Sequence, residues 1–301
     1  MNKIATLSIL SILSFSLVAS TLSHYPEVHK IIYGFDNRME VFEAPSQYSD
    51  WASATAAMVK TSDLKQTLFN RNFKWLPSVK YEERFRLCSA ERFVGQPTVS
   101  NCSGFLVAPD ILVTAGHCAM SNEQCLDSSW IFDYNAEKEG LAKITFPSKN
   151  IFKCAMIIAT EKNLVTKNDY AVIRLDRPVV GRIPLKVRLT GKIEDNTELL
   201  LIGHPSFLPT KIVDGGSIRV NIDPVYFVGN IDSFAGNSGS PVMDAKTGVV
   251  EGILVRGGKD FNYDSVKNCY TTNVCEEGDC RGEDVTRITN IANLLQTLIP
   301  N

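Results

Sequence analysis

The chain has 301 residues, of which 44% are hydrophobic and 21% are charged, so it is long enough to bury a large core and lacks the composition of a disordered protein. Its formal net charge of -2 excludes the strongly basic balance typical of nucleic-acid binding, and we expect no nucleic-acid partner. Eight cysteines predict disulfides and therefore an oxidising compartment.

Residues 1–20 have the form of a secretory signal peptide. Lys3 precedes an apolar run over 4–18, and two small residues follow at 19–20. The run is short for a membrane span, and the alternative is a buried N-terminal helix. No second apolar stretch reaches spanning length, and no cysteine at the cleavage site suggests a lipid anchor. We therefore expect a secreted or periplasmic monomer without a membrane anchor.

The segment that follows carries no evident chemistry. Residues 21–30 form a short polar stretch, and we expect them to be a propeptide. Apolar residues at helical spacing over 47–68 predict one or two helices. Basic and aromatic residues alternate over 69–96, which favours a surface segment packed on the main fold. We interpret 31–96 as an N-terminal strand and helical extension.

From Ser103 onward the chain alternates short β-rich runs with turn residues, which indicates an all-β barrel or sandwich. Strands are predicted over 104–108, 110–115, 128–134, 152–159, 170–175, 182–189, 197–204, 210–220, 224–230, 239–243 and 248–255. Apolar residues on one face of 287–298 predict a terminal helix, which we interpret as a packing element.

The stretch 231–242, IDSFAGNSGSPV, is the strongest candidate for chemistry. Small residues around Ser238 permit a sharp turn that exposes its hydroxyl, and the N–H groups of Gly236 and Ser238 can point into one concavity that stabilises an oxyanion. A serine nucleophile needs a base, and His117 ends the apolar run LVTAGHC. Asp169 begins DYAVIRLDRPV and is the candidate that orients the base. Taken alone, such a histidine is typically structural and such an aspartate is typically a turn residue or cap.

The segments TAGHC, DYAVIRL and GNSGSP, in that order, resemble the active-site segments of chymotrypsin-fold serine proteases. GNSGSP, with asparagine before the serine, is most similar to the bacterial secreted branch that includes the glutamyl endopeptidases. The resemblance covers roughly 31–297 and implies two six-stranded antiparallel β-barrels, one over 97–180 and one over 181–301. We expect the linker at 176–191, which has two prolines and two glycines, and the catalytic site in the cleft between the barrels.

That resemblance implies hydrolysis of protein or peptide substrates by Ser238, His117 and Asp169 without a cofactor. It also implies a disulfide between Cys102 and Cys118 beside the catalytic histidine. Cys125 with Cys154 is the next choice, on first-barrel proximity alone. Three pairings stay open for the remaining cysteines, which are Cys88, Cys269, Cys275 and Cys280.

We expect no metal site, because the other histidines lack metal-ligand spacing and the cysteines have no paired CxxC arrangement. The histidines concerned are His24, His29 and His204.

Residues 31–38, IIYGFDNR, resemble the mature N-terminus of the bacterial branch, so Lys30 marks an expected processing site. The alternative is an unprocessed edge strand. In trypsins the freed amine pairs with an aspartate just before the catalytic serine, whereas Asn237 occupies that position here. A neutral amide cannot form the ion pair, so any zymogen activation is expected to be built differently.

Specificity rests on residues around the serine. Bacterial relatives often cleave after glutamate with a histidine in the following strand and a hydroxyl five positions before the serine. Ser233 supplies the hydroxyl, but Leu254 stands where the histidine is expected. Asp232 has the trypsin spacing for the acid at the base of the primary pocket, although Phe234 replaces the bracing cysteine.

We therefore expect cleavage after Arg or Lys, with Asp232 and Ser233 in the pocket and Arg256 or Glu283 modifying it. In the alternative reading, Asp232 turns into solvent. The other functions that stay open are a glutamyl-specific endopeptidase, a catalytically inactive protease-like binding protein, and an esterase or HtrA-type protease.

Overall fold

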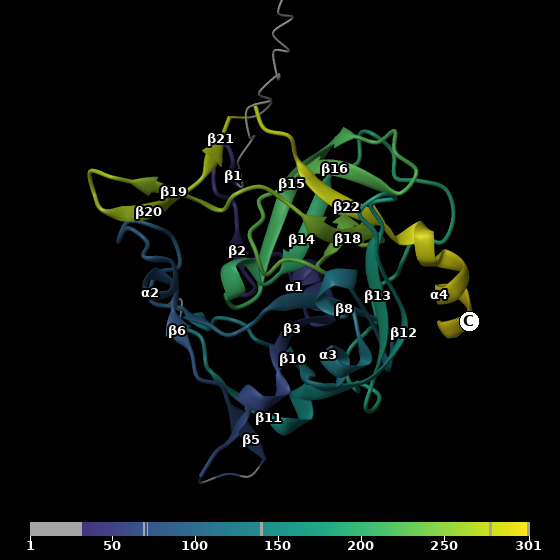
Figure 1. The fold of residues 1–301 in the computed structure, drawn as a ribbon, viewed down its shortest axis with the longest axis horizontal. Coiled ribbons are helices and arrows are strands. Elements are labelled where there is room, and N and C mark those ends of the chain that lie inside the picture. Colours follow the sequence, from purple (N-terminus) through teal and green to yellow (C-terminus); the bar gives the residue numbers. More distant parts are fainter. Residues whose placement is uncertain (1–31, 69, 71, 139–140, 277–278, 300–301) are drawn as a thin grey trace, which may run out of the picture.

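The computed structural model describes residues 32–68, 70, 72–138, 141–276 and 279–299. The expected signal peptide, the propeptide and the Lys30–Ile31 junction lie outside the described residues. Figure 1 shows two groups of strands with accessory hairpins at one side and a terminal helix at the other.

The first barrel is a closed ring of six antiparallel strands in the order β10-β12-β13-β9-β8-β3. Its strands are β3 (Thr55–Lys60), β8 (Cys102–Ala108), β9 (Ile111–Thr114), β10 (Ser128–Phe132), β12 (Ile151–Lys162) and β13 (Asp169–Leu175). All seven residues of β8 and all four of β9 are buried, because these strands lie between the barrel interior and the second barrel.

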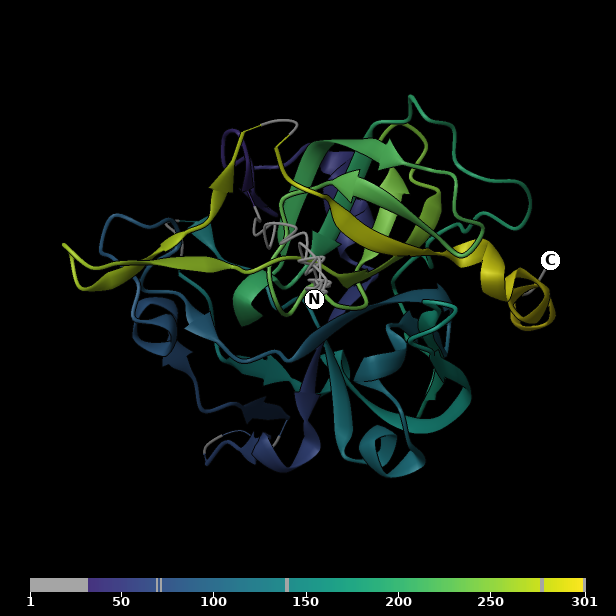
Figure 2. The same cartoon turned by 45° about the horizontal axis from the view of Figure 1, so that its top comes forward.

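The second barrel is also a ring of six antiparallel strands, because β14 pairs with both β17 and β15 and so closes the sheet. Its strands are β14 (Leu199–Gly203), β15 (Lys211–Val220), β16 (Tyr226–Asn230), β17 (Pro241–Asp244), β18 (Val250–Arg256) and β22 (Glu283–Arg287). The short strand β2 (Met39–Glu40) adds to the edge of β15. Figure 2 shows the green strands of this barrel above the blue and teal strands of the first.

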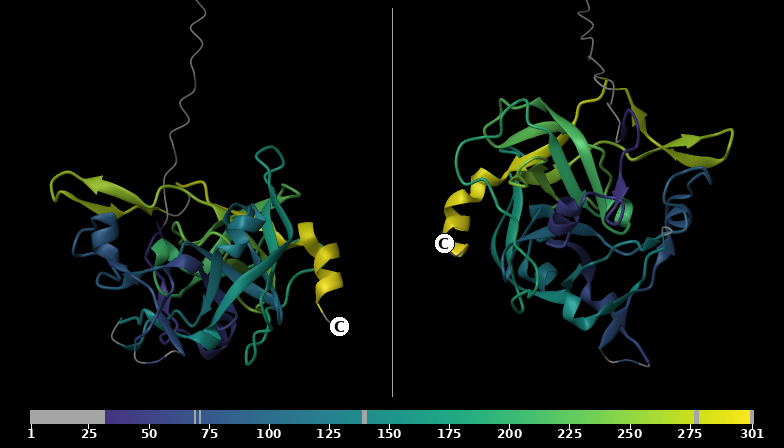
Figure 3. Two further views of the ribbon diagram at one scale, coloured as in Figure 1. Left: turned by 60° about the horizontal axis from the view of Figure 1, so that its bottom comes forward. Right: turned by 180° about the vertical axis from the view of Figure 1, so that it is seen from behind.

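Accessory elements surround the barrels. The paired short strands are β1 (Ile32–Tyr33) with β21 (Val274–Cys275), β4 (Lys65–Gln66) with β5 (Phe73–Trp75) and β11 (Thr145–Pro147), β6 (Val79–Lys80) with β7 (Pro97–Thr98), and β19 (Phe261–Asp264) with β20 (Cys269–Thr272). The α-helices are α1 (Ser46–Ala52), α2 (Tyr81–Phe85), α3 (Asn122–Leu126) and α4 (Ala292–Leu298). Figure 3 shows the β19–β20 hairpin and α4 at opposite ends of the molecule.

Two sequence-based expectations about elements are wrong. The helical reading of 47–68 holds only for α1, because Thr55–Lys60 is a strand of the first barrel, which therefore begins before residue 97. The apolar run of this segment is too short for periodicity to distinguish a strand from a helix. The segment becomes a strand because it pairs with β8 and β10 and so closes the barrel. The strand expected over 182–189 is reduced to a single bridge from Val187 to Val250.

The terminal helix forms largely where expected. A 3₁₀ turn over Ile288–Ile291 leads directly into α4. Ile288, Ile291 and Leu295 are buried, so this segment packs on the barrels through one apolar face. No helix in the described part of the chain has the length and apolar character that a membrane crossing requires.

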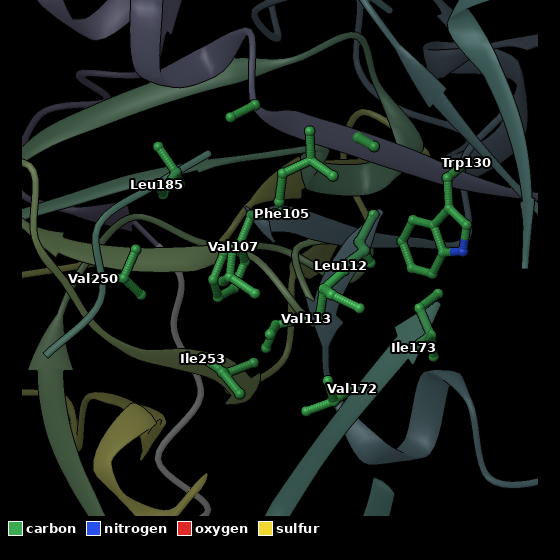
Figure 4. Packing of buried hydrophobic residues seen from close by; sticks show 14 of the residues in the cluster. Phe105, Val107, Leu112, Val113, Trp130, Val172, Ile173, Leu185, Val250 and Ile253 are labelled. Carbon is green, nitrogen blue, oxygen red and sulfur yellow. The ribbon is translucent and has the colours of Figure 1, made fainter. Parts of the chain in front are cut away.

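The main hydrophobic core is continuous between the barrels. Figure 4 shows Val107 and Val113 of the first barrel next to Val250 and Ile253 of the second, and Trp130 on the far side of the same cluster. These side chains are almost completely inaccessible to solvent. The two barrels therefore share buried apolar surface, which fixes the cleft between them.

Four disulfides are present in the described residues. Cys102–Cys118 and Cys125–Cys154 confirm the two expected pairs. The remaining four cysteines adopt one of the three pairings left open, Cys88–Cys269 and Cys275–Cys280. Cys88–Cys269 joins the segment after α2 to the β19–β20 hairpin, which are 181 residues apart in the sequence.

Candidate active site

His117 and Asp169 meet at the open end of the first barrel. β9 leads into a 3₁₀ turn over Gly116–Cys118, and Asp169 begins β13, which is paired with β9. His117 Nδ1 lies 2.9 Å from Asp169 Oδ2, and the His117 backbone N–H donates to Asp169 Oδ1 at 3.0 Å. The aspartate is buried, whereas a quarter of the histidine side chain is exposed. The buried carboxylate therefore orients the imidazole, and the ring stays accessible to solvent.

The turn around Ser238 is held against the first barrel. Ser238 is half-buried, and its carbonyl accepts a hydrogen bond from Ser103 N–H of β8 at 2.8 Å. Gly239 has φ +89°, and a Cβ at this position would lie 2.1 Å from the Ser103 carbonyl oxygen. Gly239 N–H donates to the Leu254 carbonyl at 2.8 Å. Only glycine fits here, and its fit brings the serine turn into contact with β8 and β18.

The Cys102–Cys118 disulfide ties this turn to the histidine. Cys102 precedes Ser103, Cys118 follows His117, and Cys118 Sγ lies 3.8 Å from the Ser238 carbonyl oxygen. The bridge therefore brings the serine and histidine segments to the same corner of the cleft. His117, Cys102 and Cys118 also offer ligand atoms within 4.8 Å of one another, but the bonded sulfurs cannot act as thiolate ligands for a metal.

Backbone groups beside the serine are oriented by the second barrel. The Ala235 carbonyl accepts from Ser206 N–H at 2.6 Å, and a trans peptide directs the Gly236 N–H to the opposite side. Gly236 has φ +97°, and a Cβ there would lie 2.5 Å from the His204 carbonyl oxygen. Within the described residues, neither Gly236 N–H nor Ser238 N–H has a hydrogen-bond acceptor. Both donors are thus left for an incoming oxygen.

His204 has a structural position rather than a place beside Ser238. Its imidazole is fully buried and stacks on Tyr134, with the ring centroids 5.7 Å apart. Burial lowers the pKa of His204 to about 3, so the ring is neutral. Its backbone N–H donates to Ser103 Oγ, which donates in turn to the Gly236 carbonyl. This chain of hydrogen bonds fixes the second carbonyl of the turn.

Arg256 connects the two barrels beside the His117–Asp169 pair. Its Nε donates to Asp284 at 3.0 Å, and its Nη1 lies 3.8 Å from Asp169 Oδ2. Its Nη2 donates to the Lys167 carbonyl in the loop before β13. The guanidinium is therefore engaged on the side of Asp169, where it stabilises the buried carboxylate.

A cavity of about 500 Å³, including its open mouth, lies directly beside Ser238. One wall follows the chain before the serine, and the other follows the end of β18. The lining residues are Ser233, Phe234, Ala235, Ser238, Leu254, Val255, Arg256, Gly257, Gly258, Asp260 and Glu283.

Ser233 lies in the cavity wall as expected from the sequence, whereas Asp232 does not line the cavity. Asp232 is buried, and its Oδ1 accepts from Tyr33 N–H at 2.8 Å while its Oδ2 accepts from Asn37 N–H at 3.4 Å. The expected place of Asp232 at the base of the cavity is therefore wrong, and so is the alternative that it faces solvent. Successive residues point in different directions, so the spacing to Ser238 did not determine where this carboxylate points.

Two acidic residues line the cavity instead, from parts of the sequence distant from Ser238. Glu283 is only 1% exposed, and Asp260 follows the end of β18. The Asp260 carboxylate accepts from Ala235 N–H at 3.0 Å. Burial raises the pKa of Asp260 to about 6, opposed in part by that hydrogen bond and by the charge of Arg38. The sequence suggested Glu283 only as a residue that modifies the pocket, and no motif or spacing pointed to Asp260.

Phe234, at the position of the missing cysteine, is part of an aromatic cluster formed by Tyr81, Phe85, Phe234 and Phe261. Its ring centroid lies 5.7 Å from that of Phe261, and the Arg38 guanidinium lies 4.2 Å from it. The cluster packs the cavity wall against the start of β19 and against α2. Side-chain packing thus occupies the place where the family has a disulfide.

The sequence model of the family described as "Trypsin-like peptidase domain" matches residues 102–253, a span that contains His117, Asp169 and Ser238. No curated protein matches the chain. The fold is similar to a solved Glu endopeptidase in complex with MPD, with a TM-score of 0.52 and 16% identity, over 89% of this chain and 98% of that one. It is also similar to the scabies mite inactivated protease paralogue S-D1, with a TM-score of 0.47 and 15% identity, over 66% of this chain and 86% of that one.

Proposed function

Because the chain belongs to the trypsin-like peptidase family, we propose that it is a secreted serine endopeptidase in which Ser238, His117 and Asp169 form the catalytic triad. The observation that carries the proposal is the double contact of Asp169 with His117, beside a serine turn attached to the same barrel. Four disulfides support an extracytoplasmic location, because such bonds persist in oxidising compartments. We expect the mature chain to begin near Ile31.

The chemistry follows from the residue types. Neutral His117 takes the proton of Ser238 Oγ as the oxygen attacks the scissile carbonyl, and it later gives that proton to the leaving amine. Asp169 holds the histidine tautomer with its proton on Nδ1 and stabilises the imidazolium. The N–H groups of Gly236 and Ser238 donate to the oxyanion of the tetrahedral intermediate.

We further propose cleavage after Arg or Lys, because the cavity beside Ser238 contains two carboxylates. A glutamate side chain would be repelled by these groups, and Leu254 cannot neutralise it. The glutamyl-specific alternative is disfavoured, because Arg256, the cation in this described cavity wall, already contacts Asp284 and lies near Asp169. The inactive-homologue alternative is disfavoured because all three triad residue types are present.

Labelling with a fluorophosphonate tests the nucleophile. The secreted protein should be labelled, and Ser238→Ala should lose both the label and peptide hydrolysis, by about 10⁶-fold in kcat. Ser62→Ala, which changes an exposed serine, serves as the matched control and should keep both. Near-normal hydrolysis by a folded Ser238→Ala variant would place the nucleophile elsewhere and refute the proposal.

A further inference from the structure

We propose that Glu283 and Asp260, and not Asp232, are the specificity-determining residues that bind the cationic side chain of the substrate. The inference rests on the proposed function, since it assigns the substrate class of the same site. It starts from the cavity beside Ser238, which both carboxylates line and Asp232 does not.

Glu283 reaches the cavity from the first position of β22. The strand alternates its side chains, so Glu283 and its neighbour Asp284 face opposite sides. Asp284 pairs with Arg256 at 3.0 Å, whereas the Glu283 carboxylate lies against the backbone of Gly257 in the cavity wall. A Cβ on Gly257 would lie only 1.7 Å from Glu283 Oε2, so this glycine is what gives the carboxylate its place.

Asp260 contributes from the wall that faces Ala235. One of its oxygens accepts from the Ala235 N–H, which fixes the carboxylate at the entrance to the serine turn. Arg256 also lines the cavity, but its guanidinium is engaged with Asp284 and lies near Asp169. The Arg256 guanidinium is thus directed at Asp284 and Asp169, and the two carboxylates give this cavity wall its negative charge.

Asp232 has another task. Its two oxygens accept from the backbone N–H groups of Tyr33 and Asn37, so it anchors the segment that carries β1. Ile32, which is completely buried, packs in the same apolar cluster as Phe234. Asp232 consequently stabilises the segment that packs against the cavity wall. Its carboxylate oxygens accept hydrogen bonds from the backbone of that segment and do not face the cavity.

The chemistry of the acidic pair favours arginine over lysine. Burial disfavours the charged form of a carboxylate, and a cation that enters between the two carboxylates stabilises that form in both. A guanidinium carries five donors in a planar fork and can bond two carboxylates at once, whereas an ammonium is a compact point charge. The expected order of substrates is Arg, then Lys, then neutral residues, with Glu last.

The test compares two peptide substrates that differ only in arginine or citrulline before the scissile bond. Citrulline has the shape of arginine without its charge, so the ratio of the two kcat/KM values isolates charge recognition. Glu283→Gln and Asp260→Asn should each lower this ratio, the former by about 30-fold, as expected for loss of one partner of a buried charge pair. The double variant should bring the ratio close to one.

Asp232→Asn is the matched control, since it also removes one negative charge and keeps an acceptor for the Tyr33 N–H. It should keep the arginine-to-citrulline ratio of the unmodified protein. A collapse of the ratio in Asp232→Asn, together with an unchanged ratio in the double variant, would overturn the assignment. So would a preference of the unmodified protein for Glu or for citrulline.

The same experiment separates this inference from the proposed function. Each variant is also labelled with the fluorophosphonate and assayed on the citrulline peptide, which reports the triad without the charge. Retained labelling and citrulline cleavage with a lowered ratio support the inference. Inhibition by benzamidine, a small cation, gives a second measurement on the unmodified protein, and its inhibition constant should rise about 30-fold in Glu283→Gln. An unchanged constant would contradict the inference while leaving the triad in place.

Discussion

The two sides of the Ser238 turn are held by different kinds of interaction. On the side toward Ser240, backbone groups bond to both barrels: Ser238 to Ser103, and Gly239 to Leu254. On the side toward Phe234, side chains do most of the work, through the aromatic cluster and the Asp260 carboxylate. The backbone contacts require the absence of a side chain at Gly239, whereas the contacts on the other side require particular aromatic and acidic side chains. Substitutions on the two sides should therefore have different effects on peptide hydrolysis.

The largest effect is expected from Gly239→Ala, which acts on the backbone side. The new Cβ would lie 2.1 Å from the Ser103 carbonyl, so the turn must shift and displace Ser238. Activity on every substrate should fall by about 100-fold or more, since a misplacement near 1 Å costs about that much. Gly181→Ala is the control, because Gly181 also has positive φ but nothing within 4 Å of an added Cβ. Equal activity losses in the two variants would contradict the idea of a backbone clamp.

Removal of single disulfides should have effects of intermediate size that differ between the two sides of the Ser238 turn. Removal of Cys102–Cys118 by paired serine substitutions should lower kcat on all substrates by about 10-fold to 100-fold, because this bridge joins the histidine turn to the start of β8, where Ser103 bonds to the Ser238 carbonyl. Removal of Cys88–Cys269, which ties the β19–β20 hairpin, should mainly lower the arginine-to-citrulline ratio. Cys125–Cys154 is the control and should cost stability alone, about 2 to 4 kcal/mol in thermal or denaturant unfolding. The same kinetic profile after removal of each of the three disulfides would contradict the idea that the two sides of the turn act separately.

The smallest effect is a pH dependence of selectivity. Burial raises the pKa of Asp260 to about 6, so this carboxylate is charged above that pH and becomes neutral below it. The arginine-to-citrulline ratio of kcat/KM should therefore fall several-fold between pH 8 and pH 5, and taking the ratio cancels pH effects on the catalytic step that the two substrates share. The charged groups around Asp260 include Glu283 and Arg256 in the cavity wall, Lys259 next to it in the chain, and Arg38. In Asp260→Asn the fall should be much weaker; an equally steep fall would assign it to another group.

Local sequence was sufficient for the family and for the all-β fold. Each of the three motifs is a continuous segment in which small or apolar neighbours favour a turn or a strand, so the contact of His117 with Asp169 could be predicted and Ser238 could be proposed as the nucleophile. The strands β8, β9 and β13 formed where their apolar runs indicated. Cys102–Cys118 was predictable too, because it accompanies one of those motifs.

Only the tertiary structure decided the contents of the cavity. Asp232, Asp260 and Glu283 belong to three separate segments, and no periodicity relates them. Their roles depend on the direction of each side chain after the barrels close: Asp232 toward Tyr33, the others toward the cavity. The same holds for β3, whose short apolar run became a strand because the first barrel needed a sixth member to close. Sequence motifs encode local chemistry, whereas the identity of a buried charge's partner is set by long-range packing.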